Sequence, residues 1–189
     1  MSSKLDRRIK YTRLALQESF IKLMQEKPLT KITIKEVCEL ADINRSTFYS
    51  HYKDLYDLLN QIEDGIIEDL NQTLSSFNHT KNEEAIQMTE TLLEYLVKNH
   101  ESSQTLFSEN GNPEFQQKVM MLAHQHLLNV LNADKQNLPI NAEYLSLYIV
   151  NGSIHVIQHW LKNGVKESPK EIAELIITLA NEGLSPFQQ

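Results

Sequence analysis

Residues 33–59 read TIKEVCELADINRSTFYSHYKDLYDLL and contain the pattern that decides the fold. Thr33 followed by Glu36 predicts a capping box, so a short helix is expected to begin directly after Thr33. After a turn of about four residues, Asn44 is placed to cap a second short helix at about 45–51. Two short helices with this spacing are typical of a helix-turn-helix, whose second helix enters the major groove of DNA. The stretch therefore predicts a DNA-binding unit.

The rest of the chain predicts further helices and no strand. Apolar residues recur at helical spacing, and glycine and proline are scarce. The predicted fold class is all-α with about nine helices, divided into an N-terminal three-helix unit at 1–52 and a longer helical part at 53–189. The expected helices with both ends assigned near the start of the chain are 6–26, 34–40, 45–51 and 53–77. A further helix ends near Asn99, a short one covers 102–109, and Asn112-Pro113 opens the next. Pro139 and Asn141 precede a helix that reaches Asn163-Gly164, and the last helix runs from Ser168 to Gly183.

The N-terminal end is basic although the whole chain is acidic. The net charge is −7, yet residues 1–35 carry nine Lys and Arg against three Asp and Glu. A bound polyanion is therefore expected to meet only this end. The cationic side chains at its start are Lys4, Arg7, Arg8, Lys10 and Arg13. On charge alone, an ordinary solvated face is an equal alternative.

The composition excludes several classes of protein. The single cysteine, Cys38, rules out an internal disulfide framework and a multi-cysteine zinc site, and we expect it to be a small buried residue. The sequence has no leader pattern and no window of about 20 apolar residues, which predicts a cytoplasmic protein rather than a secreted or membrane-spanning one. It also has no Gly-rich phosphate loop and no Gly-x-Ser-x-Gly, so neither an enzyme nor a cofactor is predicted.

The candidate DNA contacts lie on the second short helix and beside it. Arg45, Ser46 and Thr47 fall in its first turn, where side chains reach base edges and a guanidinium can pair bidentately with guanine. Phe48 and Tyr52 are expected to face the core. Hydroxyl, phenol and ammonium groups nearby suit phosphate oxygens. The full candidate set is Thr33, Lys35, Asn44, Arg45, Ser46, Thr47, Tyr49, His51 and Lys53.

The same stretch resembles the DNA-binding signature of the TetR/AcrR family of transcriptional regulators. The resemblance lies in Thr47-Phe48-Tyr49, in His51-Tyr52 and in the closing pair Leu58-Leu59, and the helical layout extends it to the whole chain. Asp42 and Ser46 depart from the family, in which glycine is common at both positions. Aspartate tolerates the left-handed backbone that the turn requires, whereas Ser46 leaves the base preference open.

The resemblance implies a homodimeric repressor that a small-molecule effector of unknown identity releases from a pseudo-palindromic operator in double-stranded DNA. An adaptor or co-activator that acts through a protein partner is the alternative within the family. Residues 53–189 would bind the effector and dimerise, with the last two helices of each subunit forming a four-helix bundle; helices buried in a monomer are the other interpretation. The implied interface residues are Tyr148, Gly152, His155, His159, Trp160, Ile172, Leu175, Ile176 and Leu179.

The resemblance also implies a ligand among the middle helices, at about 83–163. Apolar walls with few polar groups describe most ligand sites, and they describe a core equally well. The candidate pocket residues are Met88, Leu92, Tyr95, Phe107, Met120, Met121, His124 and Tyr148. His155 and His159 have a spacing that can chelate a metal, but no nearby Cys, Asp or Glu completes a site, so no metal is predicted.

Overall fold

The structure is a computed structural model that describes residues 2–77, 82–108, 111–133 and 141–183, with the side chains of 2–6, 132 and 133 excepted. Within these ranges every regular element is a helix, which confirms the all-α prediction. The elements are α1 (Ser2–Glu26), a 3₁₀ helix (Leu29–Lys31), α2 (Ile34–Leu40), α3 (Arg45–His51), α4 (Leu55–Ser75), α5 (Asn82–Lys98), α6 (His100–Leu106), α7 (Pro113–Ala133), α8 (Ala142–Lys162) and α9 (Pro169–Glu182).

Capping signals begin two helices where the sequence predicts. The Thr33 hydroxyl accepts a hydrogen bond from the Glu36 amide, and the Glu36 carboxylate accepts one from the Thr33 amide, so the predicted capping box is present at α2. The Lys27 ammonium on this carboxylate, together with the bonds from Thr33, lowers the pKa of Glu36 to about 2. Ser168 and Glu171 form the same reciprocal pair at the start of α9. These ends depend on residues three apart, which is why sequence alone predicts them.

Other helix ends differ from the prediction. Helix α4 begins at Leu55 rather than Lys53, because the Asp54 carboxylate accepts a hydrogen bond from the Asp57 amide at 2.8 Å and caps the helix there. Helix α1 extends back to Ser2, and α6 begins at His100. Asn44 precedes α3 as predicted, but its side chain makes no capping hydrogen bond. Pro139, which was expected before α8, lies outside the described residues.

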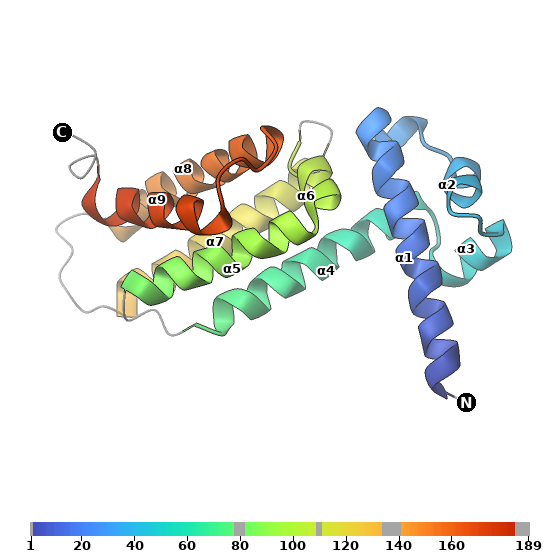
Figure 1. Cartoon of the computed structure of the whole chain (residues 1–189), viewed down its shortest axis with the longest axis horizontal. Coiled ribbons are helices and arrows are strands. Elements are labelled where there is room, and N and C mark those ends of the chain that lie inside the picture. Colours follow the sequence, from blue (N-terminus) through green and yellow to red (C-terminus); the bar gives the residue numbers. More distant parts are fainter. Residues whose placement is uncertain (1, 78–81, 109–110, 134–140, 184–189) are drawn as a thin grey trace.

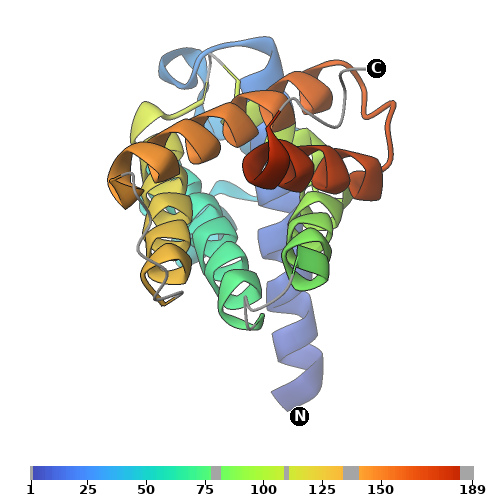
Figure 2. The ribbon, with the colours of Figure 1, turned by 90° about the vertical axis from the view of Figure 1, so that its left-hand side faces the viewer.

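The helices form two groups that α4 connects. Helices α1, α2 and α3 lie at one end of the molecule, and the N-terminal part of α1 projects away from the rest (Figure 1). Helix α4 leads from this end into a bundle in which it packs against both α5 and α7. Helix α8 packs mainly on α7, and α9 mainly on α5, so both cover the side of the bundle opposite α4 (Figure 2). None of the described helices is long and apolar enough to cross a membrane.

Two clusters of buried apolar side chains hold the molecule together. The first runs from α1, α2 and α3 along α4 as far as Leu106 and Phe115, and the second joins α5, α8 and α9 around Trp160. Tyr95 and Phe107 pack against both clusters. The first cluster passes the predicted boundary at 52/53 without a break, because Leu55, Leu58 and Leu59 of α4 belong to it. The division into two domains stays a prediction.

Candidate nucleic-acid interface and ligand cavity

Helix α3 has one buried face and one exposed face. Phe48 and Tyr52 are 0% and 1% exposed, with ring centroids 5.6 Å apart, whereas Tyr49 between them is 59% exposed. The Phe48 ring also meets the Tyr49 ring edge-on at 5.6 Å. The expected core positions of Phe48 and Tyr52 are confirmed. Packing of these two rings therefore fixes how α3 turns its other face to the solvent.

The nine predicted DNA contacts share one end of the molecule and lie on its surface. Thr47 and His51 are half-buried, and the other seven are exposed. Two of the seven already have partners: the Thr33 hydroxyl caps α2, and the Lys35 ammonium lies 3.7 Å from Glu39 Oε1. Among the described residues, no hydrogen bond or ion pair holds the Arg45 guanidinium, so this group is available to a ligand.

The turn between α2 and α3 needs a left-handed residue, and Asp42 supplies it. Its φ is 53°, the conformation for which the family commonly uses glycine. The expectation that aspartate preserves this turn is confirmed. Cys38 before the turn is 5% exposed, as predicted, and burial raises the pKa of its thiol. This thiol therefore packs as a small apolar group.

A chain of hydrogen bonds holds α1, α4 and the end of α3 together. Arg13 Nη2 donates to Gln61 Oε1 at 2.8 Å, and the Arg13 guanidinium lies over the Tyr52 ring, 5.9 Å from its centroid. Gln61 Nε2 donates to Asp57 Oδ1 at 3.2 Å, and Asp57 Oδ2 accepts from the Lys53 amide at 2.8 Å. The bond from the Lys53 amide and then the one from Gln61 lower the pKa of Asp57. Movement of α4 at Gln61 is thus connected directly to α1 and to the residues after α3.

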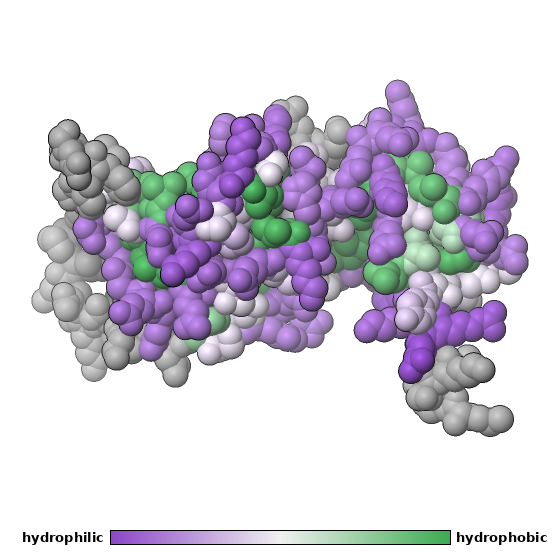
Figure 3. Space-filling model, in the orientation of Figure 1, coloured by the Kyte–Doolittle hydropathy of each residue, from purple (hydrophilic) through white to green (hydrophobic). Residues whose placement is uncertain are grey.

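Helix α1 supplies the cationic surface predicted for this end. Arg7, Arg8, Lys10 and Arg13 are all exposed, while Lys4 lies outside the described side chains. Hydrophilic residues dominate the part of α1 that projects from the body (Figure 3). Exposed cations on one projecting helix are suited to a polyanion, because phosphate neutralisation needs no fixed pocket.

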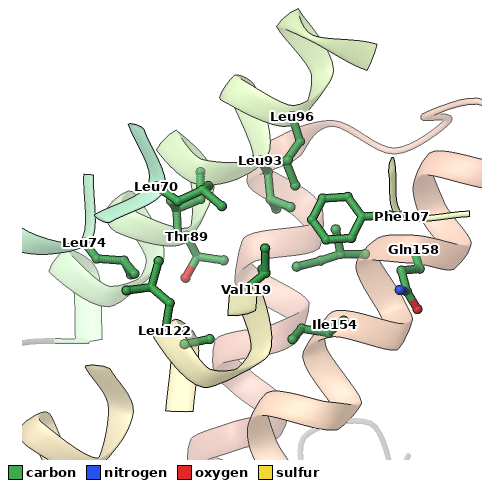
Figure 4. Close-up of a pocket in the computed structure, with 13 residues that line it drawn as sticks. Leu70, Leu74, Thr89, Leu93, Leu96, Phe107, Val119, Leu122, Ile154 and Gln158 are labelled. Atoms are coloured by element: carbon green, nitrogen blue, oxygen red, sulfur yellow. The ribbon is translucent and has the colours of Figure 1, made fainter. Parts of the chain in front are cut away.

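A cavity of about 120 Å³ lies among the helices of the bundle (Figure 4). Helix α4 contributes Leu70 and Leu74 to its wall, and Phe107 follows the end of α6. The complete lining is Leu70, Leu74, Thr89, Leu92, Leu93, Leu96, Phe107, Val119, Leu122, Ala123, Ile154, Ile157 and Gln158. Five helices or helix ends thus meet at one apolar space.

Of the eight residues predicted for an effector pocket, the cavity brings Leu92 and Phe107 together. Burial raises the pKa of Tyr95, and so does the hydrogen bond that its hydroxyl donates to Asp69. His124 Nδ1 lies 2.8 Å from the buried Ser146 Oγ, at the contact of α7 with α8. Met121 and Tyr148 are 55% and 80% exposed. Met88 and Met120 are half-buried and do not line the cavity.

Sequence reasoning missed most of the cavity wall and one buried acid. The missed wall residues lie on the inward stripes of amphipathic helices, where a core position and a cavity position look the same. Glu63 of α4 is 1% exposed, and its Oε2 accepts a hydrogen bond from Asn112 Nδ2 at 3.1 Å. Burial raises its pKa. Glu63 lies four residues after the buried Leu59 and so on the same face of the helix, and this spacing was the sequence signal for its burial.

The nine residues predicted for a dimer interface fall into three groups. Tyr148, Gly152, His155 and His159 are exposed along one face of α8, while Leu175 and Leu179 of α9 are half-buried. The remaining three, Trp160, Ile172 and Ile176, are 3%, 5% and 6% exposed and belong to the core of the chain itself. Trp160 Nε1 also donates to the Glu167 carbonyl at 3.0 Å. In the part of the chain that is described, no three His, Cys, Asp or Glu side chains are grouped to hold a metal ion.

Comparison with known proteins identifies the family. A TetR-type family model for a "Transcriptional regulator C-terminal region" matches residues 83–182, which is more than half of the chain. The chain belongs to the TetR family of transcriptional regulators. This TetR-family regulator is 23% identical over 176 residues to the uncharacterized HTH-type transcriptional regulator YxbF of Bacillus subtilis (strain 168). The match covers 88% of the chain but only 44% of YxbF, so the chain spans less than half the length of that relative.

Solved structures share the fold of this TetR-family regulator. A TetR transcriptional regulator from Streptococcus agalactiae 2603V matches with a TM-score of 0.66 and 24% identity, over 95% of this chain and 99% of that one. FadR from Bacillus subtilis, in complex with stearoyl-CoA, matches with a TM-score of 0.65 and 14% identity, over 90% of this chain and 98% of that one. The dihydroxyacetone kinase operon activator DhaS matches with a TM-score of 0.61 and 19% identity, over 94% of this chain and 98% of that one. At these identities the likeness establishes the fold alone.

Proposed function

We propose that this regulator is a cytoplasmic homodimeric repressor that leaves a pseudo-palindromic operator when a small molecule binds. The course of α4 is the observation that carries the proposal. Leu55 and Leu58 at its start belong to the core beneath α3, and Leu70 and Leu74 near its end line the cavity. These positions are separated by roughly 24 Å at 1.5 Å per residue. A ligand that displaces the end of α4 would therefore move the base on which α3 rests.

The outer face of α8 supports the homodimer. Tyr144, Leu147 and Tyr148 are 68%, 42% and 80% exposed, and Gly152 and His155 continue the same stripe. Exposed aromatic side chains in a row are typical of a surface that a partner covers. In a two-fold pair, this face would set the separation of two α3 helices at the spacing of adjacent major grooves, roughly 34–36 Å.

Gly152→Ala is expected to weaken the dimer. In the single chain, no atom beyond the two neighbouring residues and the backbone of α8 itself lies within 4 Å of a Cβ at Gly152, so the packing of the chain does not require glycine there. A partner helix that crosses at this point would meet the added methyl group. Gly65 of α4 is the matched control, because it is also helical, exposed and open on all sides. Sedimentation velocity over a dilution series measures dissociation of both variants.

Both substitutions should add helix propensity and raise the free energy of unfolding by up to about 1 kcal/mol. Only Gly152→Ala should also shift the monomer–dimer equilibrium toward monomer. Equal dissociation of the two variants would contradict a helix crossing at Gly152.

Operator binding is tested by selecting fragments of the source genome on the purified chain and measuring affinity for a retained fragment. Because the cations of α1 and α3 would neutralise phosphates, affinity should fall steeply from 50 to 200 mM salt, by about 10³-fold or more for six or more phosphate contacts. Retained fragments should share a two-fold symmetric site. Affinity that does not change with salt, or retention of no fragment at low salt, would count against DNA binding.

Gene activation is the alternative, because DhaS, which shares this fold, is an operon activator. The exposed cations of α1 favour a chain that contacts DNA itself over an adaptor that works through a protein partner. A reporter gene fused to the selected operator distinguishes repression from activation. Expression should rise when the gene for the regulator is deleted if it represses, and should fall if it activates.

A further inference from the structure

The cavity of the bundle offers a ligand almost no polar group. Of its lining residues only Thr89 and Gln158 are polar. Thr89 Oγ1 donates a hydrogen bond to the Ala85 carbonyl at 2.8 Å, within its own helix. The Gln158 side chain lies at the edge of the group of lining side chains (Figure 4). Both residues therefore contribute mainly carbon to the wall.

The lining also excludes a charged ligand group. No Asp, Glu, Lys, Arg or His is among the residues of the wall, within the part of the chain that is described. An ion moved into such a space would lose its hydration shell and gain no counter-charge, which is strongly unfavourable. A carboxylate, phosphate or ammonium would therefore have to stay outside the cavity.

The size of the cavity restricts the ligand further. Its volume of about 120 Å³ lies below the roughly 300–1,000 Å³ of most ligand sites. It is close to that of an apolar protein cavity of about 150 Å³ that stays dry and binds benzene. A single ring fits this space, whereas a long acyl chain would require the helices to separate.

We propose that this cavity selects uncharged, wholly apolar molecules of about the size of one aromatic ring, and that such a molecule is the effector of the repressor. The second half of this statement rests on the proposed function. The ligand would contact Leu70 and Leu74 on α4 and Ile154 and Ile157 on α8. It would thus touch both the helix that leads to α3 and the helix that carries the exposed aromatic face.

Three probes of similar size test the selection: toluene, phenol and benzoate, each titrated into the full chain and followed by NMR or calorimetry. Toluene should bind most tightly and phenol more weakly, because its hydroxyl finds no partner in the wall. Benzoate should bind weaker than toluene by roughly a hundredfold or more, because its charge must be desolvated. Equal binding of benzoate and toluene, or no binding of toluene, overturns the selection.

Variants locate the binding in this space. Ala123→Leu fills the cavity and should weaken toluene binding by at least about tenfold, and Val119→Ile serves as a smaller filling if Ala123→Leu does not fold. Ala142→Leu adds the same atoms outside the cavity and should leave binding unchanged. Toluene binding that survives both filling variants would overturn the assignment.

Release of DNA is measured in parallel with a labelled operator fragment. Loss of operator affinity on addition of toluene supports both halves of the proposal. If toluene binds in the cavity and operator affinity stays constant, the selection by the cavity stands and the effector role is overturned. If the chain binds no operator at all but still binds toluene, the proposed repressor function fails independently of the cavity chemistry.

Discussion

Arg45→Ala should lower the affinity for the operator by about 5- to 150-fold, the equivalent of about 1–3 kcal/mol for one bidentate contact with guanine. Arg45 lies in the first turn of α3, where a recognition helix approaches base edges. Its exposed guanidinium has no hydrogen bond or ion pair among the described residues. Substitution should therefore remove the proposed DNA contact without disturbing the fold. Fluorescence anisotropy with a labelled operator measures the change.

Two control variants separate base recognition from charge. Arg45→Lys keeps the charge but loses the planar pair of donors, so it should recover only the part of the affinity that is due to phosphate attraction. Lys170→Ala removes a cation from α9, where Lys170 pairs with Glu174 at 3.9 Å, and should leave operator affinity nearly unchanged. If Arg45→Ala binds the operator as tightly as Lys170→Ala does, Arg45 does not contact the operator.

Phe48→Ala should lower the free energy of unfolding by about 3–5 kcal/mol, as expected for deletion of a fully buried aromatic ring. Phe48 is 0% exposed and its ring packs against that of Tyr52 within the cluster that joins α3 to α1 and α4. A cavity at this point would loosen the base of α3. Urea unfolding followed by circular dichroism measures the loss.

The neighbouring residue provides a matched control with the opposite expectation. Tyr49→Ala removes an aromatic ring from the same helix, but Tyr49 is 59% exposed. This variant should stay within about 1 kcal/mol of the parent in unfolding free energy, and it should lose operator affinity at unchanged fold. If both variants unfold at the same urea concentration, the division of α3 into a buried face and a DNA face is wrong.

Sequence reasoning was most accurate where one short segment contains the whole physical cause. The capping box of Thr33 and Glu36 needs only residues three apart, and it is present at the start of α2. The left-handed turn at Asp42 is local in the same way. The start of α4 was misplaced by two residues because Lys53 and Asp54 both precede an apolar stripe, and only the bond from the Asp57 amide selects Asp54.

The candidate sites also differ in how far the local sequence could predict them. The exposed face of α3 could be predicted, because Phe48 and Tyr52 identify the buried side and the remaining side chains must face outward. Residues on α8 and α9 could not be assigned so simply. The resemblance implies that Trp160, Ile172 and Ile176 lie at an interface, and in the single chain they pack in one cluster with apolar side chains of α5. A stripe of apolar residues indicates that a face is covered, but not by what.

The sequence by itself determined the all-helical class, the capping box of α2 and the helix-turn-helix, since these follow from interactions within a few residues of one another. Only the tertiary structure decided the cavity, the burial of Glu63 against Asn112 and the contact of Arg13 with Gln61. The last two join residues 49 and 48 positions apart. The cavity is the space that side chains from five helices or helix ends leave unfilled, so it depends on how those elements meet rather than on any one of them.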